Sequence, residues 1–217
     1  MQKKLEKQIN ALRVRVDNTS QKDAIKIIAV SKKKNITYIK QAFELGVLDF
    51  GENYAQELKD KAMNLPEANW HFIGPMQSNK VKTIAKYANW IHSLDREKIA
   101  KKINEECNEL GKTIKCCIQI NISGELTKSG IPPDELFDFA KYVNALESLE
   151  LKGIMVLPSL TNDPKNQMIE SKSLHEELLS IYPGARYLSM GTTNDFESAI
   201  KYGSNMIRVG ELIFGKR

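Results

Sequence analysis

Residues 116–122, CCIQINI, decide the predicted fold because their two faces differ in chemistry. Along a β-strand, successive side chains point to opposite faces. Cys117, Gln119 and Asn121 therefore share one face, whereas the other face carries Cys116 and three isoleucines. Such a strand suits a barrel whose lumen lines a site better than an open sheet covered by helices on both faces. This stretch therefore favours a barrel.

Short apolar runs recur along the rest of the chain and alternate with segments of helical spacing. Strands alternating with helices over 217 residues predict a single α/β domain, residues 1–217, of the (β/α)8 TIM-barrel type. A doubly wound open sheet is the alternative, but no GxGxxG motif follows the first strand. The eight predicted strands are residues 26–31, 47–50, 69–74, 89–94, 113–122, 150–157, 185–190 and 205–209.

The first 20 residues precede this alternation and predict an extra helix packed on the barrel. Leu5, Ile9, Leu12 and Val16 recur every three or four residues, so they form one apolar stripe on an otherwise charged helix. This charged start lacks the apolar core of a signal peptide, and no run approaches the length of a membrane span. We therefore expect a cytoplasmic protein.

Composition excludes several classes of site. The net charge of +5 comes from basic residues that alternate with acids, which is a weak bias towards anionic partners and does not indicate a nucleic-acid binder. The three cysteines include no CxxC pair, so neither a disulfide framework nor a zinc site is indicated. His71, His92 and His175 lack metal-ligand spacing, and we expect His71 and His92 to be barrel residues. Trp70 and Trp90 are predicted to pack between barrel and helices.

The carboxyl ends of barrel strands carry the chemistry of this architecture. The first strand, in IIAVSKKKN at 27–35, runs into Ser31 followed by three lysines. A strand leaving the core needs solvated residues, and this alone would explain the lysines. A reactive amine is the other interpretation, and periodicity does not separate Lys32 from Lys33 or Lys34.

The stretch SMGTTNDFESAI, residues 189–200, follows the seventh strand and predicts an anion site. Gly191 allows a tight turn, and a helix is expected near Asn194, with Glu197 at capping-box spacing. Backbone N–H groups at such a turn bind anions, and TIM barrels frequently hold phosphate in the loops after strands seven and eight. A plain capped helix is the alternative. A lysine and a phosphate site at one barrel mouth suggest a Schiff base with pyridoxal 5'-phosphate (PLP).

Motifs along the chain carry a resemblance to a known family. AVSK, FGENYAQE, WHFIGPMQSNK, IHSLD, QINISGELTKSGI, LSMGTTNDFESAI and GSNMIRVGELIFG occur in order between about residues 26 and 215. Together they resemble the pyridoxal phosphate homeostasis protein family, the single-domain barrel relatives of alanine racemase. The resemblance implies a TIM-type barrel that binds PLP and needs no metal.

The resemblance also implies roles for individual residues. Lys32 would form the internal aldimine with PLP, Asn53 would lie near the cofactor, and Arg208 would face the pyridine nitrogen. The phosphate would be held by Ser189, Gly191, Thr193 and Gly210. The family more often has GMS where this chain has Gly191-Thr192-Thr193; Thr193 keeps the hydroxyl, whereas the role of Thr192 stays open. Lys128 of the KSGI motif is expected to be structural or a gate.

Two functions follow from this assignment. The first is a monomeric, non-enzymatic carrier without catalytic residues, which holds PLP and passes it to apo-forms of PLP enzymes. The second is an amino-acid racemase or decarboxylase of the alanine racemase barrel type. Such enzymes usually carry a further β-rich domain, and this chain stops seven residues after Gly210. A guanidinium at Arg208 would also oppose protonation of the pyridine nitrogen, so we expect the carrier. A surface position for Arg208 is the alternative.

Overall fold

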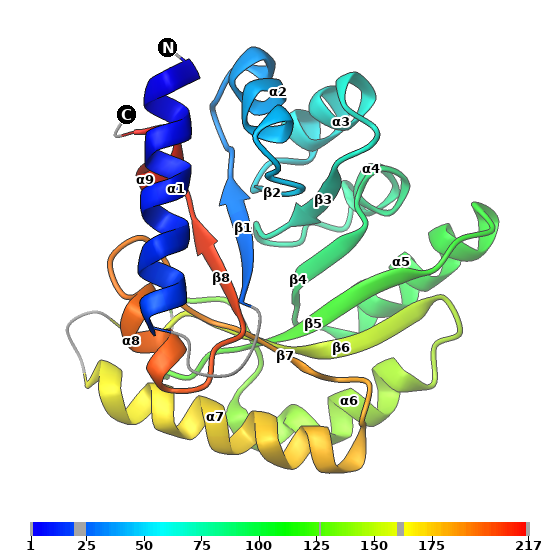
Figure 1. The fold of residues 1–217 in the computed structure, drawn as a ribbon. Coiled ribbons are helices and arrows are strands. Elements are labelled where there is room, and N and C mark those ends of the chain that lie inside the picture. Colours follow the sequence, from blue (N-terminus) through cyan, green and yellow to red (C-terminus); the bar gives the residue numbers. More distant parts are fainter. Residues whose placement is uncertain (1, 20–24, 126, 160–162, 216–217) are drawn as a thin grey trace.

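Eight parallel strands close into a barrel in the computed structural model, which describes residues 2–19, 25–125, 127–159 and 163–215 (Figure 1). Each strand pairs with its neighbour in sequence, and β1 pairs with β8 to close the ring. The predicted fold class is therefore confirmed. The strands are β1 (Lys26–Val30), β2 (Asp49–Glu52), β3 (Asn69–Phe72), β4 (Trp90–Leu94), β5 (Ile114–Ile120), β6 (Leu149–Val156), β7 (Tyr187–Ser189) and β8 (Met206–Val209).

The predicted position of the second strand was wrong by two residues. It begins at Asp49 and ends at Glu52, two residues beyond the predicted 47–50. The apolar run that suggested the earlier position includes Leu48, whose side chain is exposed. Glu52 is instead fully buried in the strand, because Ser31 and Lys61 donate hydrogen bonds to its carboxylate. Because Glu52 is polar, the apolar pattern of the sequence did not indicate that the strand extends to this residue.

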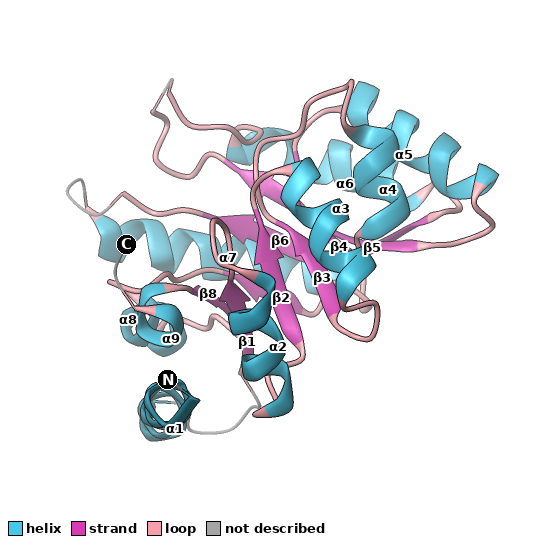
Figure 2. Cartoon of the chain, turned by 90° about the horizontal axis from the view of Figure 1, so that it is seen from above, coloured by secondary structure: helices cyan, strands magenta, loops and turns pink. Residues whose placement is uncertain are grey.

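Helices surround the barrel, as Figure 2 shows from above. They are α1 (Gln2–Thr19), α2 (Ile36–Glu44), α3 (Ala55–Asn64), α4 (Val81–Tyr87), α5 (Glu97–Glu109), α6 (Leu136–Asn144), α7 (Pro164–Ile181), α8 (Phe196–Lys201) and α9 (Glu211–Phe214), with the 3-10 turn η1 (Pro133–Glu135) before α6. The predicted extra helix is α1. Its stripe of Leu5, Ile9, Leu12 and Val16 is buried, and it lies beside α8 and α9.

The core has two layers, one outside the strands and one inside the barrel. The outer layer lies between strands and helices and includes Trp70, which packs 5.5 Å from Phe50 between ring centroids. The inner cluster contains Ile28, Trp90, Cys117, Met155 and Met206. The prediction for Trp90 was therefore wrong. It lies on the inward face of β4, two residues before His92, and stacks on the His71 ring.

The faces of β5 agree with the reasoning from CCIQINI. Cys117 belongs to the inner cluster, and Gln119 lines a cavity at the barrel mouth. Cys116, Ile118 and Ile120 belong to the outer layer. Cys107, Cys116 and Cys117 are buried free thiols.

Candidate functional site

A cavity of about 350 Å³ opens at the carboxyl ends of β1, β2, β6 and β8. This volume is within the range of about 300–1,000 Å³ that small-molecule sites occupy. Five of the predicted site residues line it: Lys32, Asn53, Thr193, Arg208 and Gly210. Ser189 and Gly191 are not among its lining residues. Lys34, Thr192 and Asn194, which were named above outside the predicted binding set, also line it. The remaining lining residues were not singled out beforehand: Val30, Ile73, Met155, Leu157, Glu211 and Gly215.

The three consecutive lysines after β1 have different surroundings. Lys32 is half-buried and lines the cavity. Lys33 is exposed, and its backbone is in the left-handed region with φ 61°. The amine of Lys34 donates hydrogen bonds to the carbonyls of Phe214 and Gly215, each at 3.2 Å. Lys32 therefore has the amine whose position suits covalent chemistry in the cavity.

Asn53 presents an acceptor that the protein leaves unused. Its Oδ1 atom is buried and has no hydrogen-bond partner within the described parts of the chain. Buried polar atoms in native structures are nearly always paired, so an unpaired one on a cavity wall indicates a ligand that donates to it. Asn53 also lines a second cavity on the same face, which Gln119, Asn121 and Lys128 share.

The loop after β7 brings backbone N–H groups to the cavity. The N–H groups of Thr193, Asn194 and Gly210 make no hydrogen bond to another protein group in the described ranges. Gly191 has φ +99°, and a Cβ atom there would lie 2.7 Å from Cβ of Ala199. Glycine is therefore required at this position for the close approach of α8 to the barrel. Gly191 thus determines the shape of the loop but does not line the cavity.

The predicted capping box is wrong. Helix α8 begins at Phe196, and Glu197 forms an ion pair with Arg15 of α1 at 2.9 Å instead of turning back to its own helix. Asp195 organises the turn, because its Oδ1 accepts hydrogen bonds from the N–H and the hydroxyl of Thr192. The hydroxyl of Thr192 is therefore already committed, whereas that of Thr193 has no such partner among the described residues.

Arg208 supplies a buried positive charge to the cavity. It lies on β8 with only 5% of its surface exposed, so it is not the surface residue of the alternative interpretation. Its guanidinium donates to the Ser189 carbonyl at 2.7 Å, the Ser189 hydroxyl at 2.6 Å and the Val156 carbonyl at 2.9 Å. Burial lowers the pKa of Arg208 to about 10, so the group is still a cation at neutral pH.

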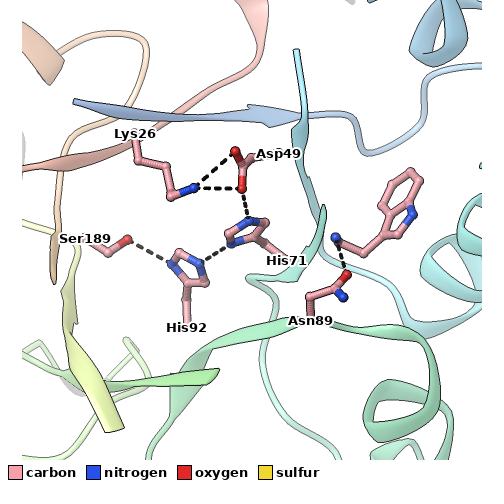
Figure 3. A network of polar contacts seen from close by, with 7 residues as sticks. Lys26, Asp49, His71, Asn89, His92 and Ser189 are labelled. Atoms are coloured by element: carbon pink, nitrogen blue, oxygen red, sulfur yellow. Dashed lines mark hydrogen bonds and ion pairs between the residues drawn. The ribbon is translucent and has the colours of Figure 1, made fainter. Parts of the chain in front are cut away.

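From Ser189, which Arg208 contacts, a chain of polar contacts runs through the barrel interior to Lys26 (Figure 3). The Ser189 hydroxyl lies 2.9 Å from Nδ1 of His92, whose Nε2 lies 2.9 Å from Nδ1 of His71. Nε2 of His71 lies 2.9 Å from Asp49, which also contacts the amine of Lys26 at 3.1 Å. Burial lowers the pKa of both histidines, so both rings are neutral.

The side chains from Ser189 to Lys26 come from five strands, β7, β4, β3, β2 and β1, and sequence patterns did not group them. His71 and His92 were expected to be barrel residues, and both lie on inward faces, but their link to Ser189 spans 97 positions of sequence. The available signal was the position of His92 in the apolar strand β4, because a polar residue within such a strand is predicted to point into the barrel. It does not identify the partner.

The donor set of the cavity suits a small anion with a reactive carbonyl group. Among the described lining residues it combines the amines of Lys32 and Lys34, one buried guanidinium, N–H groups without a protein acceptor and one unpaired amide oxygen. Within the described ranges, no cluster of histidine, cysteine or acidic residues could hold a metal ion. The helices of these ranges are also too short or too polar to cross a membrane.

Comparison with known proteins agrees with this chemistry. Residues 3–217 match the family model for the alanine racemase N-terminal domain. A curated relative from Pasteurella multocida, named pyridoxal phosphate homeostasis protein, is 45% identical over 203 residues, which cover 89% of this chain and 87% of the relative. The structure of PipY from Synechococcus elongatus with PLP bound has a TM-score of 0.84 and 29% identity, covering 97% of this chain and 100% of that chain.

An enzyme structure shares the fold at greater distance. Alanine racemase from Clostridium difficile in complex with cycloserine has a TM-score of 0.79 at 16% identity. The match covers 98% of this chain and 59% of that chain. At this level of identity the likeness concerns the barrel fold alone.

Proposed function

The chain belongs to the pyridoxal phosphate homeostasis protein family, built on the alanine racemase N-terminal domain, and from this premise we propose that it binds PLP covalently through Lys32 and holds it for delivery. The observation that carries the proposal is the cavity in which the Lys32 side chain, the Arg208 guanidinium and the N–H groups of Thr193 and Gly210 meet. When bound, PLP supplies an aldehyde that condenses reversibly with a primary amine.

The residues of the cavity divide the task of binding. Thr193 and the backbone at Gly210 bind the phosphate, because their N–H groups and the Thr193 hydroxyl have no competing protein acceptor in the described ranges. Asn53 accepts a hydrogen bond from the ligand through its unpaired Oδ1. Ser189 contributes indirectly, because its hydroxyl and carbonyl accept hydrogen bonds that hold the guanidinium of Arg208 in place. Gly191 acts through the shape of the loop.

Arg208 is the basis for proposing that the protein holds PLP and does not turn over amino acids. A guanidinium accepts no proton and, unlike a carboxylate, does not favour a protonated ring nitrogen. The one carboxylate among the lining residues is Glu211, and it is exposed to solvent. Proton transfer on a bound amino acid needs a positioned acid or base besides Lys32. Among the described lining residues the candidates are the exposed Glu211 and Lys34, whose amine already donates to the carbonyls of Phe214 and Gly215. Apo-forms of PLP enzymes are the proposed recipients.

Reconstitution with PLP tests the function directly. The purified chain is mixed with PLP, the absorption of the lysine-bound cofactor is followed, and the product is reduced with borohydride for peptide mapping. We expect the label on Lys32, loss of the absorption band in Lys32→Ala, and its retention in Lys33→Ala and Lys34→Ala. A label on Lys34, or equal affinity for PLP and for pyridoxal without phosphate, would refute the proposed site.

A further inference from the structure

A buried ion cluster lies behind the segment that carries Lys32. The amine of Lys61, on α3, donates to Glu52 at 2.8 Å, to Glu57 at 2.7 Å and to the carbonyl of Ser31 at 2.8 Å. Lys61 is only 7% exposed and Glu52 is fully buried. Lysine is rarely buried unless it is paired, so this amine has a fixed place in the fold.

The three side chains of the cluster hold the backbone on both sides of Lys32. Ser31 is held twice, because Lys61 donates to its carbonyl and its own hydroxyl donates to Glu52 at 2.5 Å. On the other side, the N–H of Lys33 donates to Glu57 at 2.7 Å. Lys32 is therefore the one residue between two clamped neighbours.

The clamped segment is a tight turn with an unfavourable conformation. The N–H of Lys34 donates to the carbonyl of Ser31 at 3.0 Å, which closes a four-residue turn. The third residue, Lys33, has φ 61°, in the left-handed region that is unfavourable for residues with a side chain like that of lysine. Such a conformation persists only where surrounding contacts impose it, and such strain concentrates at functional sites. Here the contacts come from Glu52, Glu57 and Lys61.

The cluster is not arranged for stability alone. The Oε2 atom of Glu52 is buried and has no hydrogen-bond partner among the described residues. A buried ion group with an unsatisfied oxygen costs stability compared with apolar packing. The cluster nevertheless forms hydrogen bonds with three polar groups of the turn: the carbonyl of Ser31, the hydroxyl of Ser31 and the N–H of Lys33.

We infer that Lys61, with Glu52 and Glu57, is a positioning residue that aims the Lys32 side chain into the cavity and so controls covalent attachment of the cofactor. This inference rests on the proposed function of Lys32. Misplacement of a reacting group by about 1 Å can cost on the order of 100-fold in rate. A loosened turn should therefore weaken attachment through Lys32 while the phosphate contacts on β7 and β8 are unchanged.

Two cofactor forms separate attachment from simple binding. PLP has the aldehyde that reacts with an amine, whereas pyridoxine 5'-phosphate has an alcohol in its place and binds only through phosphate and ring. We expect Lys61→Met to slow attachment of PLP, followed as the appearance of the lysine-bound absorption, by about 10- to 100-fold. It should also raise the Kd of PLP and leave the Kd of pyridoxine 5'-phosphate unchanged. Lys61→Arg should restore part of the difference, because it keeps a donor cation.

The matched control is Lys59→Met, which removes a half-buried lysine from the same helix. It should change neither constant. If Lys61→Met does not fold, Glu52→Gln/Lys61→Met removes the buried charges together, and it should show the same selective loss. An equal rise of both constants, or no change in either, would overturn the inference. If the wild-type chain itself does not distinguish the two forms, the proposed function fails, so the two failures are distinguishable.

Discussion

Arg208 donates two hydrogen bonds to Ser189, one to its carbonyl at 2.7 Å and one to its hydroxyl at 2.6 Å. The pair joins β7 to β8 inside the barrel and places a cation on the cavity wall, and no carboxylate of the described residues is in contact with it. Ser189 is the point at which the cavity connects to the histidines below it. Removing its hydroxyl therefore changes both the cavity and the interior.

Ser189→Ala should lower stability and weaken PLP binding together. The change removes an acceptor from Arg208 and leaves Nδ1 of His92 buried and unpaired, which costs about 1–3 kcal/mol. Urea unfolding and PLP titration measure the two effects. Ser93→Ala is the control, because its hydroxyl is equally buried but donates to Gly74, outside the cavity lining. It should lose stability and keep its PLP affinity.

The tautomers of His71 and His92 follow from the direction of the hydrogen bonds. Asp49 is a carboxylate that only accepts, so Nε2 of His71 carries the proton it donates there, and its Nδ1 accepts from His92. At the other end, the Ser189 hydroxyl accepts from Arg208 and donates its own proton to Nδ1 of His92. Nε2–H of His92 then donates to His71, and Nε2–H of His71 donates to Asp49. Long-range ¹H–¹⁵N NMR should show both rings neutral with the proton on Nε2. A proton on Nδ1 of either ring would contradict this direction.

Stability should fall as the pH falls below about 6.5. Burial lowers the pKa of His71 and of His92, so the folded chain keeps both rings neutral while histidines of the unfolded chain protonate. The unfolded state then binds more protons, and the free energy of unfolding decreases. Burial raises the pKa of Glu52, which acts in the opposite direction.

The midpoint of urea unfolding, measured between about pH 7.5 and 5.5, tests this dependence, because histidines of the unfolded chain titrate in this range. A variant comparison isolates the histidines from Glu52. His92→Asn should show a shallower pH dependence than the wild type over that window. Identical slopes in the two proteins would show that the buried rings do not cause it.

Thr193→Val should weaken binding of PLP but not that of pyridoxal without phosphate. The substitution keeps the shape of the side chain and removes one hydroxyl donor, whose bond to a charged phosphate is worth about 1.5–3 kcal/mol, or roughly 10- to 150-fold in Kd. Thr192→Val is the matched control, because that hydroxyl already donates to Asp195. A larger effect at Thr192 than at Thr193 would reverse the assignment of the two threonines.

The PLP-loaded protein should not exchange the α-proton of amino acids. Arg208 presents a cation, and among the described lining residues the acid or base groups besides Lys32 are the exposed Glu211 and Lys34, whose amine is held by the carbonyls of Phe214 and Gly215. Incubation with single L-amino acids in deuterated water, followed by NMR, measures the exchange. Rates on the order of 1 per second or faster would support the racemase alternative. Free PLP at the same concentration sets the background.

Local sequence patterns determined the fold and the residue types of the site. Alternation along CCIQINI predicted which face of β5 points inward, and the stripe from Leu5 to Val16 predicted α1, because both depend on periods of two or 3.6 residues within one element. The motifs similarly brought Lys32, Arg208 and Thr193 to one barrel mouth, since parallel strands of a barrel end at a common face.

Only the tertiary structure decided what each polar side chain contacts. Ser189 and Thr193 both carry hydroxyls in one motif, yet the first donates into the barrel and the second lines the cavity. Glu197 has capping-box spacing but pairs with Arg15, which is 182 positions away. The Lys61 cluster reaches Ser31 from another helix in the same way. Such partners are set by packing between distant elements, and hydrogen bonds between them leave no period in the sequence from which they could be predicted.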